Sequence, residues 1–461
     1  MDRISYLPNP LRSHIVSFLP FKEAIRSSIL SRKWRHLCSS LSNLDFRQLE
    51  QNRYEDREQF NSIIDRTLIL HDGSDIRECC LVIRLAEYDS LSALHINTWI
   101  CFALRHNVRK LKLTICSAVG NEDFEQLQLP CSLFNCSTLI ALTLSIEDLK
   151  FPAIIRFPVL TKLKLWHITF PGEYITSKLF SDSSCPMLND LLIGYCDLEN
   201  FTTLNISFPN LKRFRLYVYE DDLQSYKINL SAPNLLKFGY KSSYPPNIIF
   251  KTFSSIVFAT FNGHGYLSDL DVVDNYASKI LMELRNVKTL ALLGHFLEFL
   301  NRDPDFCSRL PTPYCNLKYL QLGMNAAKNQ GHLLVFLLRS CPNIQGLTIT
   351  YPWVTPTLLN VIGVENYWPS EEFLAGDLLK CLKTVAIEYF QGSESEQDIV
   401  RFLLQSASNL ETMFIIWYYV EHENSDIRAK ISQDLLSITR ASPQAEVVFF
   451  SRDRVAYVSN S

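Results

Sequence analysis

The sequence lacks the short motifs of the common catalytic and nucleotide-binding sites. It contains no G-x-S-x-G elbow, no P-loop, no H-E-x-x-H helix and no G-x-G-x-x-G turn. Its ten histidines are dispersed, and its thirteen cysteines include no C-x-x-C pair. Scattered cysteines are typical of small buried residues in a reducing compartment rather than of a disulfide or zinc framework. We therefore expect a non-catalytic protein with no metal and no cofactor.

Long apolar stretches are missing as well. The apolar run at 413–420 has only eight residues, whereas a membrane-spanning helix needs about 18 or more. No stretch near the N-terminus has the uninterrupted apolar core of a secretory signal peptide. We therefore expect a protein of the cytoplasm or the nucleus that is neither secreted nor inserted in a membrane.

An excess of charge of one sign is missing too, except near the N-terminus. The chain has 45 Lys and Arg against 48 Asp and Glu, a net charge of −3, which predicts no general affinity for nucleic acid or for an anionic membrane. Residues 1–47 differ, because they carry eight basic side chains against three acidic ones. This excess is local, and we interpret it as the solvated flank of helices.

What the sequence does have is a dense set of helix signals in residues 7–37. Leu11, Ile15 and Phe18 recur at helical spacing. Prolines precede this run, where the missing N–H of the first helical turn costs little. Pro20 predicts that the helix ends at the residue before it.

Two more short helices are expected directly afterwards. A second run covers 21–29 and includes Ala24, and Ser31 has the character of an N-cap for a third helix that carries Trp34 and Leu37. Three helices in about 30 residues cannot bury a sufficient core alone. Their remaining apolar face should therefore pack against another surface.

This stretch resembles the F-box, in the form common in plant proteins. The matching segments are Leu7-Pro8, 17–20, 30–32 and 44–46. The resemblance implies docking onto a Skp-type adaptor, and through it onto a cullin scaffold, in an SCF-type ubiquitin ligase. The implied adaptor-binding residues are Leu7, Pro8, Leu11, Ile15, Phe18, Leu19, Pro20, Lys22, Ala24, Ile25, Leu30, Ser31, Trp34 and Leu37.

Three positions depart from the usual pattern of this family. Asn9 stands where an acidic residue is usual, Pro10 follows it, and Cys38 stands where a second Trp is often found. These departures leave open an alternative, in which the F-box is degenerate and the chain is a non-ligase scaffold for protein interactions.

From residue 108 onward a short pattern repeats. Each copy has an apolar residue, two further positions and then an alternating run of Leu, Ile or Phe, and the copies are about 21 to 38 residues apart. One such strand cannot cover its own apolar face, so neighbouring copies should stack into a solenoid. The copies begin at Val108, Leu139, Leu160, Leu188, Leu211, Leu235, Val287, Leu317, Ile344, Leu382 and Leu410, with a degraded copy near Ile256.

The L-x-x-L-x-L pattern resembles the leucine-rich repeat in an irregular form. Several copies open with a proline corner, such as Phe208-Pro209 and Cys341-Pro342, which stiffens the chain before the strand without removing a ladder hydrogen bond. The expected fold class is α/β, with a small three-helix region followed by an irregular solenoid of short parallel strands and helices or loops.

The C-terminal part resembles the FBD domain, which commonly ends plant F-box proteins. The resemblance rests on 382–392, 396–413 and 440–443. Apolar spacing there predicts two helices and a terminal strand at 447–450. We interpret this part as an α/β unit that caps the open end of the solenoid.

The expected organisation has four parts. They are an F-box at 1–47, a connecting helix with the first repeat region at 48–106, irregular leucine-rich repeats at 107–360 and an FBD domain at 365–450.

Aromatic residues mark a candidate substrate-binding surface, because Tyr and Trp are favoured in recognition. Tyr217 and Tyr219 share one strand, and Tyr351 and Trp353 lie at an insertion. The hypothesis that results is a substrate-recognition subunit, whose repeats bind an unidentified substrate protein. A further alternative is that the solenoid senses a small molecule, as some plant F-box repeat proteins do.

Overall fold

The structure is a computed structural model that forms two compact units. Unit 1 consists of Met1–Tyr217, Ser225–Asn234 and Ile249–Thr252, and unit 2 consists of Val218–Gln224, Leu235–Ile248 and Phe253–Ser461. The residues it describes are 6–27, 34, 39–48, 54–85, 93–117, 128–147, 149–198, 201–219, 226–250, 255–263, 276–302, 313–325, 330–351, 379–418 and 425–451.

Unit 1 begins with α1 (Asn9–Ser17), whose start tolerates its prolines. Pro8 is the N-cap residue, and its carbonyl accepts hydrogen bonds from the amides of Leu11 at 3.1 Å and Arg12 at 3.2 Å. Pro10 falls in the first helical turn, where an N–H has no partner within the helix. The helix is therefore unbroken at Pro10.

The first helix ends two residues earlier than expected. The amides of Phe18 and Leu19 bond to carbonyls three residues back, at 3.2 and 3.0 Å, and such bonds tighten and close the final turn. The helix thus stops at Ser17, and α2 (Phe21–Ser27) begins directly after Pro20.

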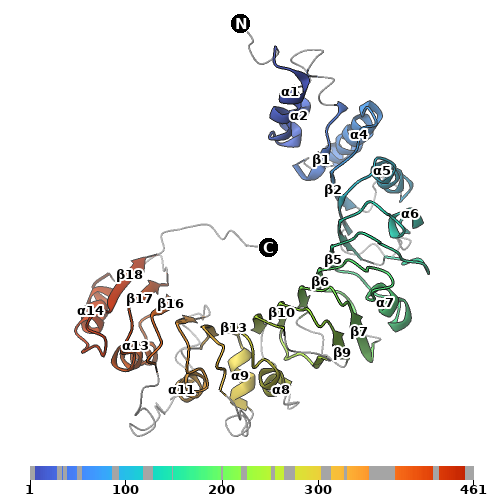
Figure 1. Cartoon of the computed structure of the whole chain (residues 1–461). Coiled ribbons are helices and arrows are strands. Elements are labelled where there is room, and N and C mark those ends of the chain that lie inside the picture. The colour runs from blue at the N-terminus through green and yellow to red at the C-terminus, as the bar shows by residue number, and fades with distance from the viewer. Residues whose placement is uncertain are drawn as a thin grey trace. The chain divides into compact units, whose positions relative to one another are not determined.

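The body of unit 1 is a parallel sheet with helices on one side of it (Figure 1). Every neighbouring pair of strands from β1 to β8 is parallel. The strands are β1 (Asn43–Asp45), β2 (Glu78–Leu85), β3 (Lys110–Ser117), β4 (Ala141–Ile146), β5 (Lys162–Trp166), β6 (Asp190–Gly194) and β8 (Arg213–Tyr217). The other elements are the 3-10 turn η1 (Phe46–Gln48) and the helices α4 (Tyr54–Leu70), α5 (Ala93–Arg105), α6 (Cys131–Phe134) and α7 (Glu173–Leu179).

The strand register confirms the predicted repeats. The first inward-pointing residue of each strand pairs with the same position of the next, and each of these side chains is at most 2% exposed. Stacked in this way, the copies bury one continuous apolar column. Its members are Leu111, Leu142, Leu163, Leu191 and Phe214.

A second, small sheet in this part of the chain was not predicted. It contains β7 (Thr203–Ser207), β9 (Lys227–Ser231) and β11 (Ile248–Phe250), with β7 and β9 parallel. Apolar and polar residues alternate in β7 and β9, which is a strand signal. These two strands lie between the L-x-x-L-x-L copies, so the repeat pattern does not include them.

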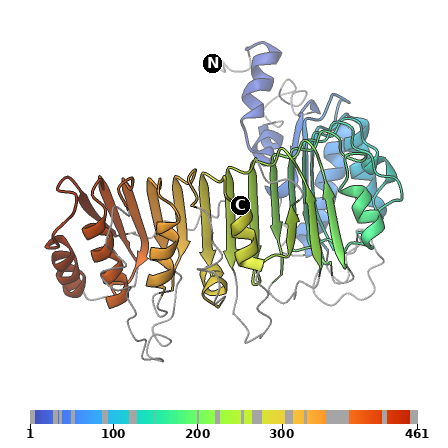
Figure 2. The same cartoon turned by 60° about the horizontal axis from the view of Figure 1, so that its bottom comes forward.

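Unit 2 continues the same plan, with parallel strands in chain order and helices on one side (Figure 2). The degraded copy near Ile256 is confirmed as β12. The strands are β10 (Lys237–Ser242), β12 (Phe258–Gly263), β13 (Thr289–Gly294), β14 (Tyr319–Gly323), β15 (Gly346–Thr350), β16 (Thr384–Phe390), β17 (Thr412–Trp417) and β18 (Glu446–Ser451). The helices are α8 (Tyr276–Glu283), α9 (Phe296–Arg302), α11 (Gly331–Arg339), α13 (Glu394–Ser406) and α14 (Ser425–Leu436).

The two helices and the terminal strand expected near the C-terminus are present as α13, α14 and β18. Ser393 and Glu396 form a capping box at the start of α13, which satisfies amides that a helix start leaves without partners. Strands β16 to β18 extend the sheet beyond β15. Residues 365–378 of the expected FBD segment lie outside the described residues.

Asparagine side chains tie successive repeats together at the corners before the strands. The Nδ2 of Asn210 donates to the Pro186 carbonyl at 3.0 Å, and Asn343 donates to the Cys315 carbonyl at 2.8 Å. Asn234 and Asn409 make equivalent bonds. Each bond satisfies a backbone carbonyl of the preceding repeat.

None of the helices in the described part of the chain has the length and apolar character that crossing a membrane requires.

Candidate functional site

The N-terminal helices expose an apolar surface. Leu11 is 51% exposed, Phe18 74% and Leu19 39%. Leu11, the half-buried Ile15 and Phe18 are spaced by four and three residues, so they lie on one helix face. We call Leu11, Phe18 and Leu19 the N-terminal apolar surface. Contiguous exposed apolar groups of this kind mark interaction sites.

The opposite side of the same helices is buried in unit 1. Val16, Phe21 and Ala24 are at most 5% exposed. Phe21 meets the ring of Phe46 edge-on, with 4.8 Å between ring centroids, and Leu44 of β1 is also buried. Among the described residues, the helices therefore pack through one face and expose Leu11, Phe18 and Leu19 on the other.

The structure sorts the fourteen expected adaptor-binding residues by accessibility. Beside the N-terminal apolar surface, the exposed ones are Pro8 and Pro20. The half-buried ones are Leu7, Ile15, Lys22 and Ile25. The buried ones, which support the helices from inside, are Ala24 and Trp34. Those outside the described residues are Leu30, Ser31 and Leu37.

One residue beside this surface was not predicted, and a further exposed aromatic residue precedes α1. The His14 ring packs edge-on against Phe18, with 4.7 Å between centroids, and Tyr6 is 83% exposed. Extending the helical spacing of Phe18 back by four residues would have found His14, whereas nothing in the local pattern marks Tyr6.

A second candidate surface is formed by the strand residues of unit 1 that alternate with the buried column. Register places them in three rows across the strands. We call them the open face of unit 1: Lys110, Lys112, Thr114, Ala141, Thr143, Ser145, Lys162, Lys164, Trp166, Asp190, Leu192, Gly194, Arg213, Arg215 and Tyr217.

This open face is basic, with six Lys or Arg against one carboxylate, and two of its rows continue onto β2 and β1 with the carboxylates of Glu78 and Asp45. Arg213 and Arg215 both bind that carboxylate, Asp190, at 2.7 and 3.0 Å. Burial lowers the pKa of Lys164, and the neighbouring charge of Arg215 lowers it further. The positive potential therefore exceeds what the face itself neutralises.

Tyr217 belongs to an aromatic cluster on this face. The centroid of Trp166 lies 5.7 Å from that of Tyr217 and 6.0 Å from that of Tyr195, and His167 stacks on Tyr195 at 5.8 Å. The sequence analysis named Tyr217 but missed its three neighbours. Aligning the repeats identifies Trp166, because Trp166, Gly194 and Tyr217 share one register row. His167 and Tyr195 directly follow Trp166 and Gly194 in the sequence.

The other expected substrate residues have different positions. Tyr219 is 43% exposed, whereas Tyr351 is only 2% exposed. Tyr351 is therefore a core residue, and its burial removes it from the residues that a partner can reach. Trp353 lies outside the described residues.

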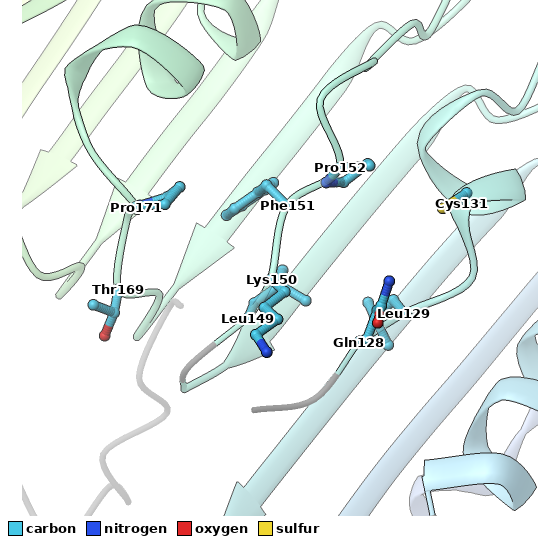
Figure 3. Close-up of a pocket in the computed structure, with 9 residues that line it drawn as sticks. All are labelled: Gln128, Leu129, Cys131, Leu149, Lys150, Phe151, Pro152, Thr169 and Pro171. Carbon is cyan, nitrogen blue, oxygen red and sulfur yellow. The ribbon is translucent and has the colours of Figure 1, made fainter. Parts of the chain in front are cut away.

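Loops that follow β3, β4 and β5 surround a hollow of about 270 Å³ (Figure 3). Its floor is apolar, with Leu129, Leu149 and Phe151, and Gln128 and Lys150 supply polar groups. Carboxyl ends of neighbouring parallel strands are a common place for ligands, and pockets for small molecules start at about 300 Å³. The hollow is thus at the lower limit for a small-molecule site.

Burial makes several of the cysteine thiols unreactive by raising their pKa. It raises the pKa of Cys79, Cys185 and Cys196 to about 12. These thiols stay protonated at neutral pH, and the thiolate is the nucleophile and the metal ligand. Among the described residues, no group of three or more His, Cys, Asp or Glu is arranged to hold a metal ion.

Comparison with known proteins gives two family matches. Residues 67–439 match the family described as At1g61320/AtMIF1, LRR domain, and residues 4–46 match the F-box domain. The second match contains the whole N-terminal apolar surface, and the first contains the open face of unit 1.

Several proteins of Arabidopsis thaliana are similar over much of the chain. F-box/LRR-repeat protein At3g58980 is 28% identical over 76% of this chain, which spans 60% of that relative. FBD-associated F-box protein At5g22730 is 26% identical over 97% of this chain and 94% of its own length. F-box/LRR-repeat protein At3g59210 is 28% identical over 98% of this chain and 94% of its own length.

Proposed function

Since the chain belongs to the At1g61320/AtMIF1 leucine-rich-repeat family and carries an F-box, we propose that it is the substrate-recognition subunit of an SCF-type ubiquitin ligase. In this proposal the F-box binds a Skp-type adaptor and, through it, a cullin scaffold. The repeats bind the substrate protein, and other subunits perform ubiquitin transfer in the cytoplasm or the nucleus.

The observation that carries the proposal is the exposed N-terminal apolar surface. Leu11, Phe18 and Leu19 present apolar area to solvent on helices whose other face is already buried. Exposing such side chains is unfavourable by roughly 25 cal/mol per Å², so a partner that covers them stabilises the complex. Centrally placed aromatic side chains often dominate such interfaces, which makes Phe18 the expected anchor.

The start of α1 argues against a degenerate F-box. Pro10 lies in the first turn, and the carbonyl of Pro8 still accepts two amide hydrogen bonds. The helix that carries Leu11 and Phe18 therefore forms despite the unusual Asn9-Pro10 pair. This geometry favours the ligase subunit over the non-ligase scaffold.

The C-terminal segment that resembles the FBD domain fits a structural part in this proposal. Strand β18 ends the described sheet, and Arg428 of α14 contacts β17, because its guanidinium lies 5.2 Å from the centroid of the Trp417 ring. End repeats of a solenoid need a cap. We therefore assign this segment to capping, and we assign substrate contact to the repeats.

The test is co-purification of the full chain with a Skp-type adaptor after co-expression. Phe18→Glu places a charge in the expected centre of the interface and should lower adaptor recovery at least about tenfold. Leu19→Ala combined with Pro20→Ala should lower it less, because less apolar area is lost. Ile69→Glu is the matched control, since Ile69 at the end of α4 is 81% exposed but lies outside the surface.

Adaptor recovery that is equal for wild type, Phe18→Glu and Ile69→Glu would contradict the proposal, as would no recovery from wild type. Folding is checked by thermal unfolding of each variant, since an exposed substitution should leave it nearly unchanged. If adaptor binding appears only after Asn9 and Pro10 are replaced by the residues usual in F-boxes, the non-ligase scaffold is the better description.

A further inference from the structure

The open face of unit 1 carries its basic side chains at regular intervals. The middle row runs across strands β3, β4, β5, β6 and β8. Its residues, in that order, are Lys112, Thr143, Lys164, Leu192 and Arg215. Cations thus alternate with uncharged residues across five strands. Neighbouring strands are about 4.8 Å apart, so the charges in this row are about 10 Å apart.

Half of the six cations on this face form ion pairs, because Lys110 lies 3.8 Å from Glu78 of β2 and both arginines bind Asp190. Within the described part of the chain, Lys112 and Lys164 form no ion pair, and Asp190 is shared by Arg213 and Arg215. The remaining cations repel one another, and the pKa of Lys164 is lowered first by its burial and then by the charge of Arg215. An anion bound along this row would relieve that repulsion.

An aromatic shelf borders the row of cations. Trp166 lies across Gly194 so closely that a Cβ there would be 2.3 Å from its Cε3 atom. A side chain at residue 194 would therefore displace the indole ring. With Trp166 in place, its ring, Tyr217, Tyr195 and His167 form one continuous group. We call these four residues the aromatic shelf.

Two members of the shelf have a backbone conformation that favours glycine. His167 has φ 53° and Tyr195 has φ 50°, a left-handed region that is unfavourable for a residue with a Cβ. In unit 2 the equivalent position of β13 is glycine, Gly294, with φ 60°, while that of β16 is Tyr389, also with φ 60°. Glycine would therefore adopt this backbone conformation with less strain than His167 or Tyr195. Backbone strain of this kind is concentrated at sites that hold ligands.

From these observations we propose that the open face of unit 1 binds an extended anionic segment of a partner protein. Carboxylate or phosphate groups of the segment pair with Lys112, Lys164 and Arg215, and an apolar or aromatic side chain packs on the aromatic shelf. A segment in the polyproline II conformation rises about 3.1 Å per residue and has three residues per turn. Every third side chain then points to the same side, so a segment that crosses the strands matches the row with one anion every third residue. The proposal rests on the proposed function, in which this segment belongs to the substrate.

The experiment selects binders for the full-length chain from a displayed library of random 12-residue peptides. The expected result is enrichment of Asp or Glu at positions i, i+3 and i+6, together with at least one aromatic or large apolar residue. The best peptide is then synthesised in three forms, with Glu, with phosphoserine and with Gln at the anionic positions. Comparing the Glu and phosphoserine forms distinguishes the two sources of negative charge.

Two variants test the face itself by fluorescence anisotropy with the labelled peptide. Lys112→Glu with Lys164→Glu should weaken binding at least about tenfold. The control, Lys178→Glu with Lys279→Glu, changes the net charge equally at two exposed helical lysines and should change affinity less than about twofold. High salt should weaken wild-type binding because it screens exposed charges.

The shelf is tested with His167→Gly combined with Tyr195→Gly. Because glycine accepts the left-handed backbone, this variant should keep or raise the midpoint of thermal unfolding while it weakens peptide binding about fivefold or more. Unchanged binding would overturn the role of the shelf.

Peptides without acidic enrichment, equal effects of the two lysine pairs, or tighter binding of a single-stranded RNA 20-mer than of the peptide would overturn the proposal. Adaptor co-purification from the same preparations separates this failure from failure of the proposed function. Adaptor binding without acidic peptide binding removes only the further inference, whereas the reverse result removes the ligase assignment and leaves the anionic site.

Discussion

The two units use the same repeat, yet their open faces differ in charge. On β1 to β8 of unit 1 the outward positions carry seven basic side chains and three acidic ones. The equivalent positions of β10 and β12 to β18 in unit 2 carry two basic residues, Lys237 and Lys241, and two acidic ones, Glu388 and Glu446. The buried columns are alike in both units, so the fold does not require the excess charge of unit 1.

This difference separates two demands on a repeat protein. Inward positions are restricted to large apolar residues, because each must fill the space between neighbouring repeats. Outward positions are free to vary, so an excess of one charge there is not required by the packing of the repeats. The following variants test whether the buried cores of the two units are equally important for stability and whether their outward positions differ in charge.

The largest effect is expected from emptying the core of each unit separately. Phe214→Ala in unit 1 and Phe261→Ala in unit 2 each remove a ring that is 0% exposed, at about 3–5 kcal/mol. Calorimetry should show each variant lowering the transition of its own unit. If both variants shift one shared transition by the same amount, the chain unfolds as a single cooperative block and the units are not independent.

The next effect is expected at the buried carboxylate of unit 2. Glu396 is 0% exposed and accepts hydrogen bonds from the amides of Gln391 and Ser393 and from the Ser393 hydroxyl. Glu396→Ala leaves these buried donors without a partner and should lower the free energy of unfolding by about 2 kcal/mol. Chemical denaturation measures this, and Glu394→Ala, at the neighbouring position of the helix start, is the control.

Glu396 also predicts a pH dependence. Burial raises its pKa above the ordinary value, against the opposing effect of its hydrogen bonds. The folded state then holds the proton more tightly than the unfolded state, so the contribution of Glu396 to stability grows as the pH falls toward its unfolded pKa. Glu396→Gln does not titrate, so wild type should gain stability relative to this variant as the pH is lowered from neutral toward the ordinary value of 4.5. A constant difference would contradict the raised pKa.

A smaller effect is expected where unit 1 neutralises part of its charge. Asp190→Ala removes the carboxylate that Arg213 and Arg215 share. Because both arginines are partly exposed, we expect a loss of only about 1 kcal/mol, which high salt reduces. Denaturation at low and high salt measures it, and Asp190→Asn separates charge from shape. An equal loss at all salt concentrations would show that packing, not charge, is the cause.

The smallest effect should be the same in both units. Asn210→Ala and Asn343→Ala each remove one hydrogen bond between repeats and should each cost about 1 kcal/mol. Their chemical denaturation curves provide the measurement. A clear difference between them would indicate that the corners of the two units are not equivalent.

Much of this fold was predictable from local sequence. The L-x-x-L-x-L copies located β3 to β6, β8, β10 and β12 to β17, because inward apolar side chains must recur at each strand. Pro20 likewise indicated where the first helix ends, and the apolar spacing around Ala24 indicated the second helix. The small sheet of β7 and β9 was missed, since its strands lie between repeats and follow another pattern.

The candidate sites were only partly predictable, because accessibility depends on what packs around a residue. Phe18 and Ala24 belong to the same motif, but Phe18 is 74% exposed and Ala24 is 1% exposed. Tyr217 and Tyr351 were equivalent candidates in the sequence, yet Tyr351 is buried.

Sequence was sufficient for the class of the protein, since an F-box and a solenoid are each encoded in short, local periodicities. Tertiary structure alone decided which side chains meet. Trp166, Tyr195 and Tyr217 come from three repeats, and only the parallel register of β5, β6 and β8 brings their rings together beside a row of lysines and an arginine. The physical reason is that stacking converts a spacing of more than 20 residues along the chain into about 5 Å between strands.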